Sequence, residues 1–141
     1  MESTINTQER VRRRELAEQA RGVITRTLSI DDADDCSLMS GYNGFYLQIV
    51  FSELHPLMVF YLARSLNRPI RGNDSRAIND LNLKAVLGSH AINAEMGCYS
   101  FRSAHWLDSE LTMERFLEML ERGSEEASRA YSQLTQLEGN K

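Results

Sequence analysis

The side chains of this sequence that are most able to take part in a chemical reaction lie close together in its C-terminal half. They are His90, Cys98, Arg102 and His105. A thiol becomes a nucleophile when a neighbouring histidine lowers its pKa, so an enzyme would need His90 or His105 within hydrogen-bond reach of Cys98. A regular strand of seven residues would separate Cys98 from His105 by about 23 Å. Only His90 therefore remains as a candidate base for Cys98.

Strand alternation divides the candidates around Cys98 between two faces. Cys98, Arg102 and Trp106 share one face of the expected strand. The other face carries Tyr99, Phe101, Ser103 and His105.

A turn centred near Glu95 would pair His90 with about Ser100 and Cys98 with about Ile92. His90 and Cys98 would then be diagonal neighbours on one face, ~7 to 8 Å apart. That distance is too long for direct proton transfer, although a bulge could close it. The sequence therefore predicts no catalytic residues.

Cofactor and metal signals are equally sparse. The candidate zinc ligands are scattered singly, at His55, His90, His105 and Cys98, whereas zinc sites usually draw on Cys or His pairs at short spacing. No glycine-rich phosphate-binding pattern occurs between an expected strand and helix. We expect no metal, no cofactor and no enzymatic activity.

Composition indicates an ordinary globular chain. Its 141 residues, 42% hydrophobic and 26% charged, are the size of a single domain, residues 1–141. The net charge of -4 disfavours nucleic acid as a partner. No apolar run approaches the ~20 residues that span a bilayer, and the start lacks a secretion-signal pattern. We expect a cytoplasmic protein with reduced thiols and no membrane partner.

The elements expected to position these residues form an α+β fold. Helical spacing predicts an amphipathic helix over 8–28, and the acidic run 31–35 reads as a solvated loop. A meander follows, with strands at 37–40, 45–51 and 57–63 and an Asn43-Gly44 hairpin turn. A short helix over 74–82, capped by Asn73 or Asp74, then leads into a second hairpin, 86–92 and 98–106.

A long helix over 112–137 is expected to complete the fold, with Phe116 and Leu120 as core anchors and Gly123 as a candidate break. Five strands covered by helices on one face would leave aromatic residues on the other face for self-association or a partner. The candidate interface or pocket residues are Phe51, Phe60, His90, Tyr99, Phe101, Arg102, His105 and Trp106.

The order of elements over roughly residues 10 to 135 resembles the YbjN family, proteins proposed as regulators of bacterial sensory transduction. The resemblance is carried by Ala77-Ile78-Asn79-Asp80-Leu81-Asn82 running into a hairpin and a terminal amphipathic helix. It implies a fold similar to type III secretion chaperones and a role in regulation or protein binding, and it supplies no catalytic residues.

Two functions follow as hypotheses. The first is a non-enzymatic cytoplasmic regulatory module that forms a homodimer and presents a chaperone-like surface to another protein. The alternative is a small-molecule sensor or enzyme with a pocket between sheet and helices, using His90, Arg102 and His105 as its polar groups.

Overall fold

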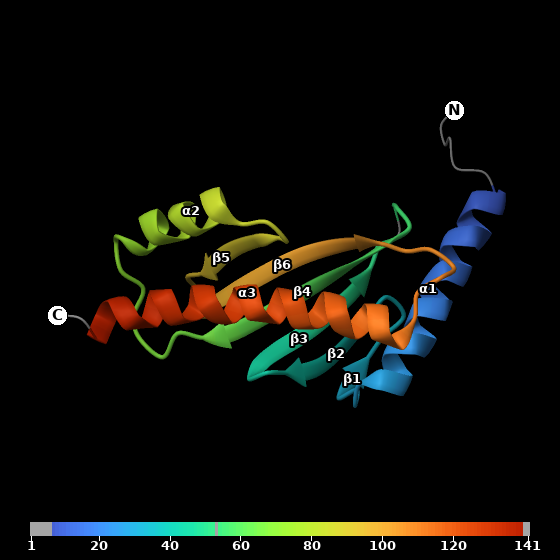
Figure 1. Ribbon diagram of the computed structural model, residues 1–141, viewed down its shortest axis with the longest axis horizontal. Helices are drawn as coiled ribbons and strands as arrows, with labels where there is room; N and C mark the ends of the chain where they lie inside the picture. Colours follow the sequence, from blue (N-terminus) through green and yellow to red (C-terminus); the bar gives the residue numbers. More distant parts are fainter. Residues whose placement is uncertain (1–6, 53, 140–141) are drawn as a thin grey trace.

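The architecture follows from a computed structural model, which describes residues 7–52 and 54–139, and the side chains up to residue 136. Within these described residues, three helices accompany one antiparallel sheet (Figure 1). The elements in chain order are α1 (Thr7–Thr27), β1 (Asp32–Ala33), β2 (Ser37–Tyr42), β3 (Phe45–Phe51), β4 (Leu57–Ser65), α2 (Asp74–Lys84), β5 (Ser89–Asn93), β6 (Cys98–Trp106) and α3 (Met113–Gly139). The predicted α+β class is confirmed.

The sheet has six strands in the order β1-β2-β3-β4-β6-β5, one more than predicted. The extra strand, β1, lies within the acidic run that the sequence assigned to a solvated loop. Asp32 pairs with Met39, and Ala33 pairs with Leu38. The pairing holds because β2 presents a free edge, and both β1 residues remain exposed to water, where charge costs little.

The first hairpin forms as predicted. Asn43 and Gly44 adopt φ angles of 50° and 82° between β2 and β3. Positive φ at both positions is the type I′ geometry that matches strand twist, and asparagine and glycine tolerate it best. This turn sets the register in which Leu38 faces Ile49 and Ser40 faces Leu47.

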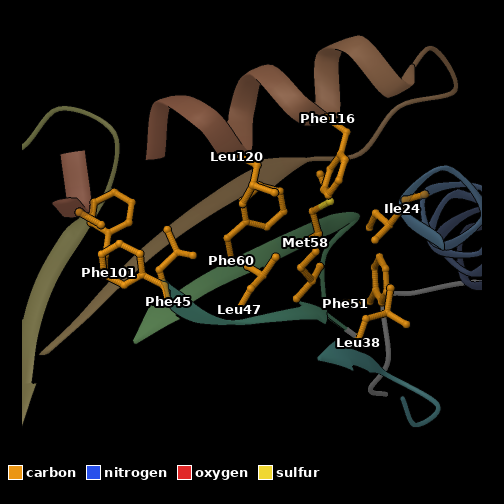
Figure 2. Close-up of a cluster of buried hydrophobic side chains, with 14 of the residues drawn as sticks. Ile24, Leu38, Phe45, Leu47, Phe51, Met58, Phe60, Phe101, Phe116 and Leu120 are labelled. Atoms are coloured by element: carbon orange, nitrogen blue, oxygen red, sulfur yellow. The ribbon is translucent and has the colours of Figure 1, made fainter. Parts of the chain in front are cut away.

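The core lies on one face of the sheet, beneath α3 and beside α1 (Figures 1 and 2). Phe116 and Leu120 of α3 are fully buried, which confirms them as core anchors. Thr112 begins the helix by accepting a hydrogen bond from the Arg115 amide at 3.1 Å. Gly123 does not break the helix, because a buried glycine inside α3 keeps its backbone hydrogen bonds and only lowers helix propensity.

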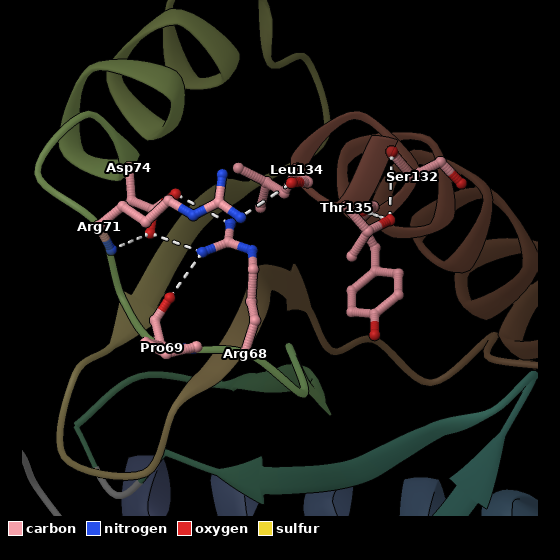
Figure 3. Close-up of polar contacts among 8 residues, drawn as sticks. Arg68, Pro69, Arg71, Asp74, Ser132, Leu134 and Thr135 are labelled. Atoms are coloured by element: carbon pink, nitrogen blue, oxygen red, sulfur yellow. Dashed lines mark hydrogen bonds and ion pairs between the residues drawn. The ribbon is translucent and has the colours of Figure 1, made fainter. Parts of the chain in front are cut away.

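A buried ion pair holds the start of α2 against the far end of α3. The Arg68 guanidinium makes two bonds to the Asp74 carboxylate, at 2.9 and 3.0 Å, and also donates to the Leu134 carbonyl at 3.4 Å (Figure 3). Asp74 also accepts the Arg71 amide at 2.7 Å. Asn73 occupies the N-cap position without a side-chain cap bond, so Asp74 is the residue that satisfies backbone donors here.

The second hairpin starts later than predicted, at Ser89, because Gly88 passes very close to β6. A Cβ atom on Gly88 would lie 2.1 Å from the Arg102 carbonyl oxygen and 2.9 Å from Phe101 Cζ. No side chain fits at that separation, so glycine is required by the close approach of two backbones.

Replacing Gly88 with alanine is therefore expected to lower the unfolding free energy by about 1 to 3 kcal/mol or more, since backbone must move to admit the methyl group. Gly123→Ala is the matched control, because its Cβ would meet Phe101 Cε2 at 3.4 Å and alanine favours a helix by ~1 kcal/mol. Urea denaturation of both variants measures the difference. Equal stabilities for the two variants would contradict the close-approach explanation.

Candidate functional site

Four of the residues expected at an interface or pocket belong to the core instead. Phe51, Phe60, Tyr99 and Phe101 are each at most 5% exposed and pack beneath the helices. Their placement corrects the prediction. The reason is that all four alternate to the face that α1 and α3 cover, so their side chains stabilise the fold and reach no partner.

The second hairpin also separates Cys98 from His90. Its register pairs His90 with Phe101 and Cys98 with Asn93, one residue away from the expected pairing. A shift of one residue moves a side chain to the opposite face of the sheet. His90 therefore points into the core, while Cys98 lies on the other face and cannot use His90 as a base.

His90 instead lies in a buried network that connects β5, β6 and α3. Its Nδ1 lies 2.7 Å from the Tyr99 hydroxyl, and its Nε2 lies 3.0 Å from Glu126 Oε2. The other oxygen of Glu126 accepts the Leu87 amide at 3.3 Å. With Nε2 protonated, a neutral His90 donates a hydrogen bond to Glu126 and accepts one from Tyr99. Both ring nitrogens of His90 then have a hydrogen-bond partner.

The electrostatics of the network agree with a neutral histidine. Burial lowers the pKa of His90, and the hydrogen bond and charge of Glu126 oppose that effect. Burial also raises the pKa of Tyr99, to which the Glu126 charge adds. The Tyr99 hydroxyl therefore stays protonated and donates its hydrogen bond to His90 Nδ1. The network thus holds α3 against the second hairpin.

His105 lies on the core face of β6, beside a cavity of about 340 Å³ between β6 and α3. Its Nε2 is hydrogen-bonded to the Ser103 hydroxyl at 3.0 Å, and its ring packs on Phe60 with centroids 4.6 Å apart. Among the described residues, the hydrogen bond recorded for the His105 ring is the one to Ser103. The cavity is lined by Leu87, Ser103, His105, Glu118, Met119, Arg122 and Gly123.

Buried His90 and partly buried His105 make stability depend on pH. Burial lowers the pKa of His105 as it does that of His90, whereas histidines of the unfolded chain titrate near 6.5. Below that pH the unfolded chain binds more protons than the fold, so stability is lost as pH falls.

We expect the unfolding free energy to fall between pH 7 and pH 5, with a slope of up to ~1.4 kcal/mol per pH unit for each histidine. Urea denaturation at several pH values measures the slope. His90→Gln or His105→Gln should each make the unfolding free energy less dependent on pH over this range. A slope unchanged in both buried-histidine variants would contradict this account.

The face of the sheet opposite α1 and α3, which we call the open face, carries exposed apolar side chains. Tyr46 is 78% exposed, Trp106 66% and Met39 39%. Partly exposed Val50 and Tyr61 lie between them on β3 and β4. Large contiguous patches of exposed apolar surface often mark contacts with other macromolecules, and these residues are the exposed apolar ones on this face.

Arg102 and Trp106 are the two sequence-predicted site residues that lie on the open face. The Arg102 guanidinium lies over the Tyr61 ring, 5.9 Å from its centroid, and Nε donates to the Tyr61 hydroxyl at 3.4 Å. The Trp106 indole contacts the His55 ring edge to face, with centroids 6.2 Å apart. Both side chains are exposed at the β6 side of the face.

Both edges of the sheet are protected against pairing with a strand of another molecule. On β5, Asn82 of α2 accepts the His90 amide at 2.7 Å and donates to the His90 carbonyl at 3.0 Å, so it occupies the backbone groups that another strand would use. At the opposite edge β1 is only two residues long and lies among aspartates. Strand addition at these two edges is therefore disfavoured.

Sequence reasoning missed Glu126, Asn82 and Asp32. Glu126 meets His90 across 36 positions, and no local spacing indicates such a contact. Asn82 was noticed only as part of a helix, although an amide just before an edge strand is a recognisable signal for edge protection. Asp32 was read as a member of a charge run.

Other classes of site find no support in the described residues. No cluster of three or more His, Cys, Asp or Glu side chains is placed to hold a metal ion in residues 7–52 and 54–139. Over the same part of the chain, no helix is long and apolar enough to cross a membrane.

Comparisons with known proteins identify a structural relative. No protein-family model matches this sequence, and no curated protein matches it. Among solved structures, the crystal structure of YbjN, a proposed transcription regulator from E. coli, superposes with a TM-score of 0.59 at 11% identity. The match covers 86% of this chain and 93% of that one. The chain therefore has the fold of YbjN, and the resemblance first indicated by the order of its elements is confirmed at the level of fold.

Proposed function

We propose that this protein is a non-enzymatic regulatory module that forms a homodimer and binds another protein. The observation that carries the proposal is the open face, where Tyr46, Trp106 and Met39 expose apolar surface that no helix of the described chain covers. The fold of YbjN, which is described as a proposed transcription regulator, supports a regulatory role.

The chemistry of the face favours protein over nucleic acid. Tyrosine, tryptophan and methionine are enriched in protein interfaces, where their rings fill pockets at low entropic cost. A nucleic-acid surface needs clustered positive charge, and this chain has a net charge of -4. Regulation would therefore act through protein contacts.

A homodimer would bury the open face and leave a second exposed apolar group for the regulated protein. Leu83 and Val86, at the end of α2 and just after it, are 77% and 87% exposed. They lie beyond the β5 edge, away from the centre of the open face. One surface can thus serve self-association while the other remains accessible.

Light scattering coupled to size-exclusion chromatography tests the dimer. We expect a mass of twice the 16.1 kDa chain at micromolar concentration, and Trp106→Glu should shift the protein toward monomer because the charge would be buried. Leu83→Glu is the matched control and should leave the mass unchanged. A wild-type mass of one chain at every concentration would refute the homodimer.

A small-molecule sensor is the second candidate, favoured by the cavity between β6 and α3. Its volume of about 340 Å³ lies at the lower end of ligand pockets, and its lining combines apolar Leu87 and Met119 with polar Ser103 and His105. Native mass spectrometry would reveal a retained ligand, and Met119→Trp should abolish its binding by filling the space. No adduct in purified protein would leave the cavity without support as a site.

A further inference from the structure

The open face carries two charged residues along its strands, one of each sign. Strand alternation and the cross-strand pairs place Asp32 of β1 and Arg102 of β6 there, among neutral side chains. Among the described residues, neither side chain takes part in an ion pair. Two opposite charges without ionic partners are thus available for an external contact.

Their positions are symmetric about β3. The register runs from Asp32 to Met39, then to Gln48, Tyr61 and Arg102, so the five residues form one row across neighbouring strands. Asp32 and Arg102 each lie two strands from Gln48, about 9.6 Å at a spacing of ~4.8 Å per strand. Gln48 is therefore midway between the positive and the negative charge.

We infer that a second copy of this chain docks on the open face about a two-fold axis that runs along β3 over Gln48. The inference rests on the proposed homodimer and adds its geometry. Rotation about this axis exchanges the two sides of the row, so Asp32 of each protomer meets the partner's Arg102. The symmetry makes the contact twice, as in every isologous interface.

Neutral residues near the axis suit the same arrangement. Met39 meets the partner's Tyr61, which places a flexible thioether against an aromatic ring. Gln48 meets the partner's Gln48, and a primary amide offers both a donor and an acceptor to its own copy. In the next row, Val50 meets the partner's Val50 across the axis. No like charges are brought together along the strands.

The spacing of packed sheets accommodates the charge pairs. Two sheets that pack face to face lie ~10 Å apart, and the long arginine side chain can reach a carboxylate on the facing sheet. The guarded edges at Asn82 and β1 leave the face as the route of self-association. Face-to-face docking therefore satisfies both the charges and the apolar surface.

Charge reversal tests the geometry. Sedimentation equilibrium at low ionic strength, where charge contacts are least screened, would give the dimer dissociation constant for Asp32→Arg, Arg102→Asp and the double variant. Each single substitution should raise the constant at least about tenfold, because like charges then meet twice, and the double variant should return to within about threefold of the wild type. Arg76→Asp, an equal charge change on exposed α2, is the control and should have no effect.

The outcomes separate the inference from the proposed function. A dimer whose dissociation constant is the same in the wild type and all three variants would overturn the two-fold geometry while leaving the homodimer intact. Weakening by both single variants without recovery in the double variant would also overturn the pairing. A wild-type chain that is monomeric at all concentrations would overturn the homodimer and this geometry together.

Cross-linking gives an independent measurement at the axis. In a Cys36→Ser and Cys98→Ser background, Gln48→Cys should be joined to its copy by a short bis-maleimide, because the two positions face each other. Ser89→Cys, three strands away in the same row, is the control and should not be joined, since its copies would be about 29 Å apart in the plane of the sheets. Equal cross-linking of both variants would overturn the inferred axis.

Discussion

Phe116→Ala is expected to lower the unfolding free energy by about 3 to 5 kcal/mol. Phe116 is fully buried and meets Phe60 edge to face, with ring centroids 5.7 Å apart and planes at 84° (Figure 2). Truncation removes the burial of the ring, the aromatic contact and the packing of α3 on β4, and it leaves a cavity. Chemical denaturation followed by circular dichroism measures the loss.

The control for this prediction is the next residue along the helix. Leu117 is 38% exposed, so Leu117→Ala should change stability far less than Phe116→Ala. A loss below about 0.5 kcal/mol for Phe116→Ala, the scale of surface substitutions, would show that α3 does not pack on the sheet through this residue.

Asp74→Ala should destabilise the fold by a similar amount, about 3 to 5 kcal/mol. The Arg68 and Asp74 side chains are only 4% and 8% exposed, so removing the carboxylate leaves a buried guanidinium without its counter-charge. The Arg68 hydrogen bond holds the pKa of Asp74 below its usual range, against the opposing effect of burial. The pair therefore stabilises the fold above pH ~3.9 and is lost as pH falls through the lower pKa of the folded state.

Two further variants isolate the buried charge. Glu118→Gln breaks an exposed pair with Arg122 and should cost under about 1 kcal/mol. Arg68→Met combined with Asp74→Leu removes both charges and should cost less than Asp74→Ala alone, because no isolated charge remains. A double variant as unstable as the sum of its single substitutions would show that the two residues do not act as a pair.

Local signals in the sequence specified much of this fold. The Asn43-Gly44 turn and the apolar stripe through Phe116 and Leu120 each depend on neighbours within a few residues, and both were predicted correctly. The second hairpin shows the limit of such signals. Its turn ends at Gly97, with φ of 65°, and the pairing of Asn93 with Cys98 moves the register by one residue.

The same limit governed the candidate site. Alternation correctly divided Arg102 and Trp106 from Tyr99 and Phe101, but it could not say which face the helices cover. That choice depends on long-range packing of α1 and α3. The hydrogen-bond partner of His90 likewise could not be predicted from the sequence, because Glu126 belongs to a helix that follows the last strand.

Through two hydrogen bonds between Asn82 and the His90 backbone, α2 covers part of the β5 edge, which could otherwise pair with a strand of another molecule. While α2 is docked, the outer edge of β5 offers no free donor or acceptor at His90. Local detachment of α2 would expose that edge as a template for strands of other molecules while the rest of the sheet is still folded. The eleven-residue helix α2 therefore covers this part of the β5 edge only while it stays docked, whatever the stability of the core beneath the sheet.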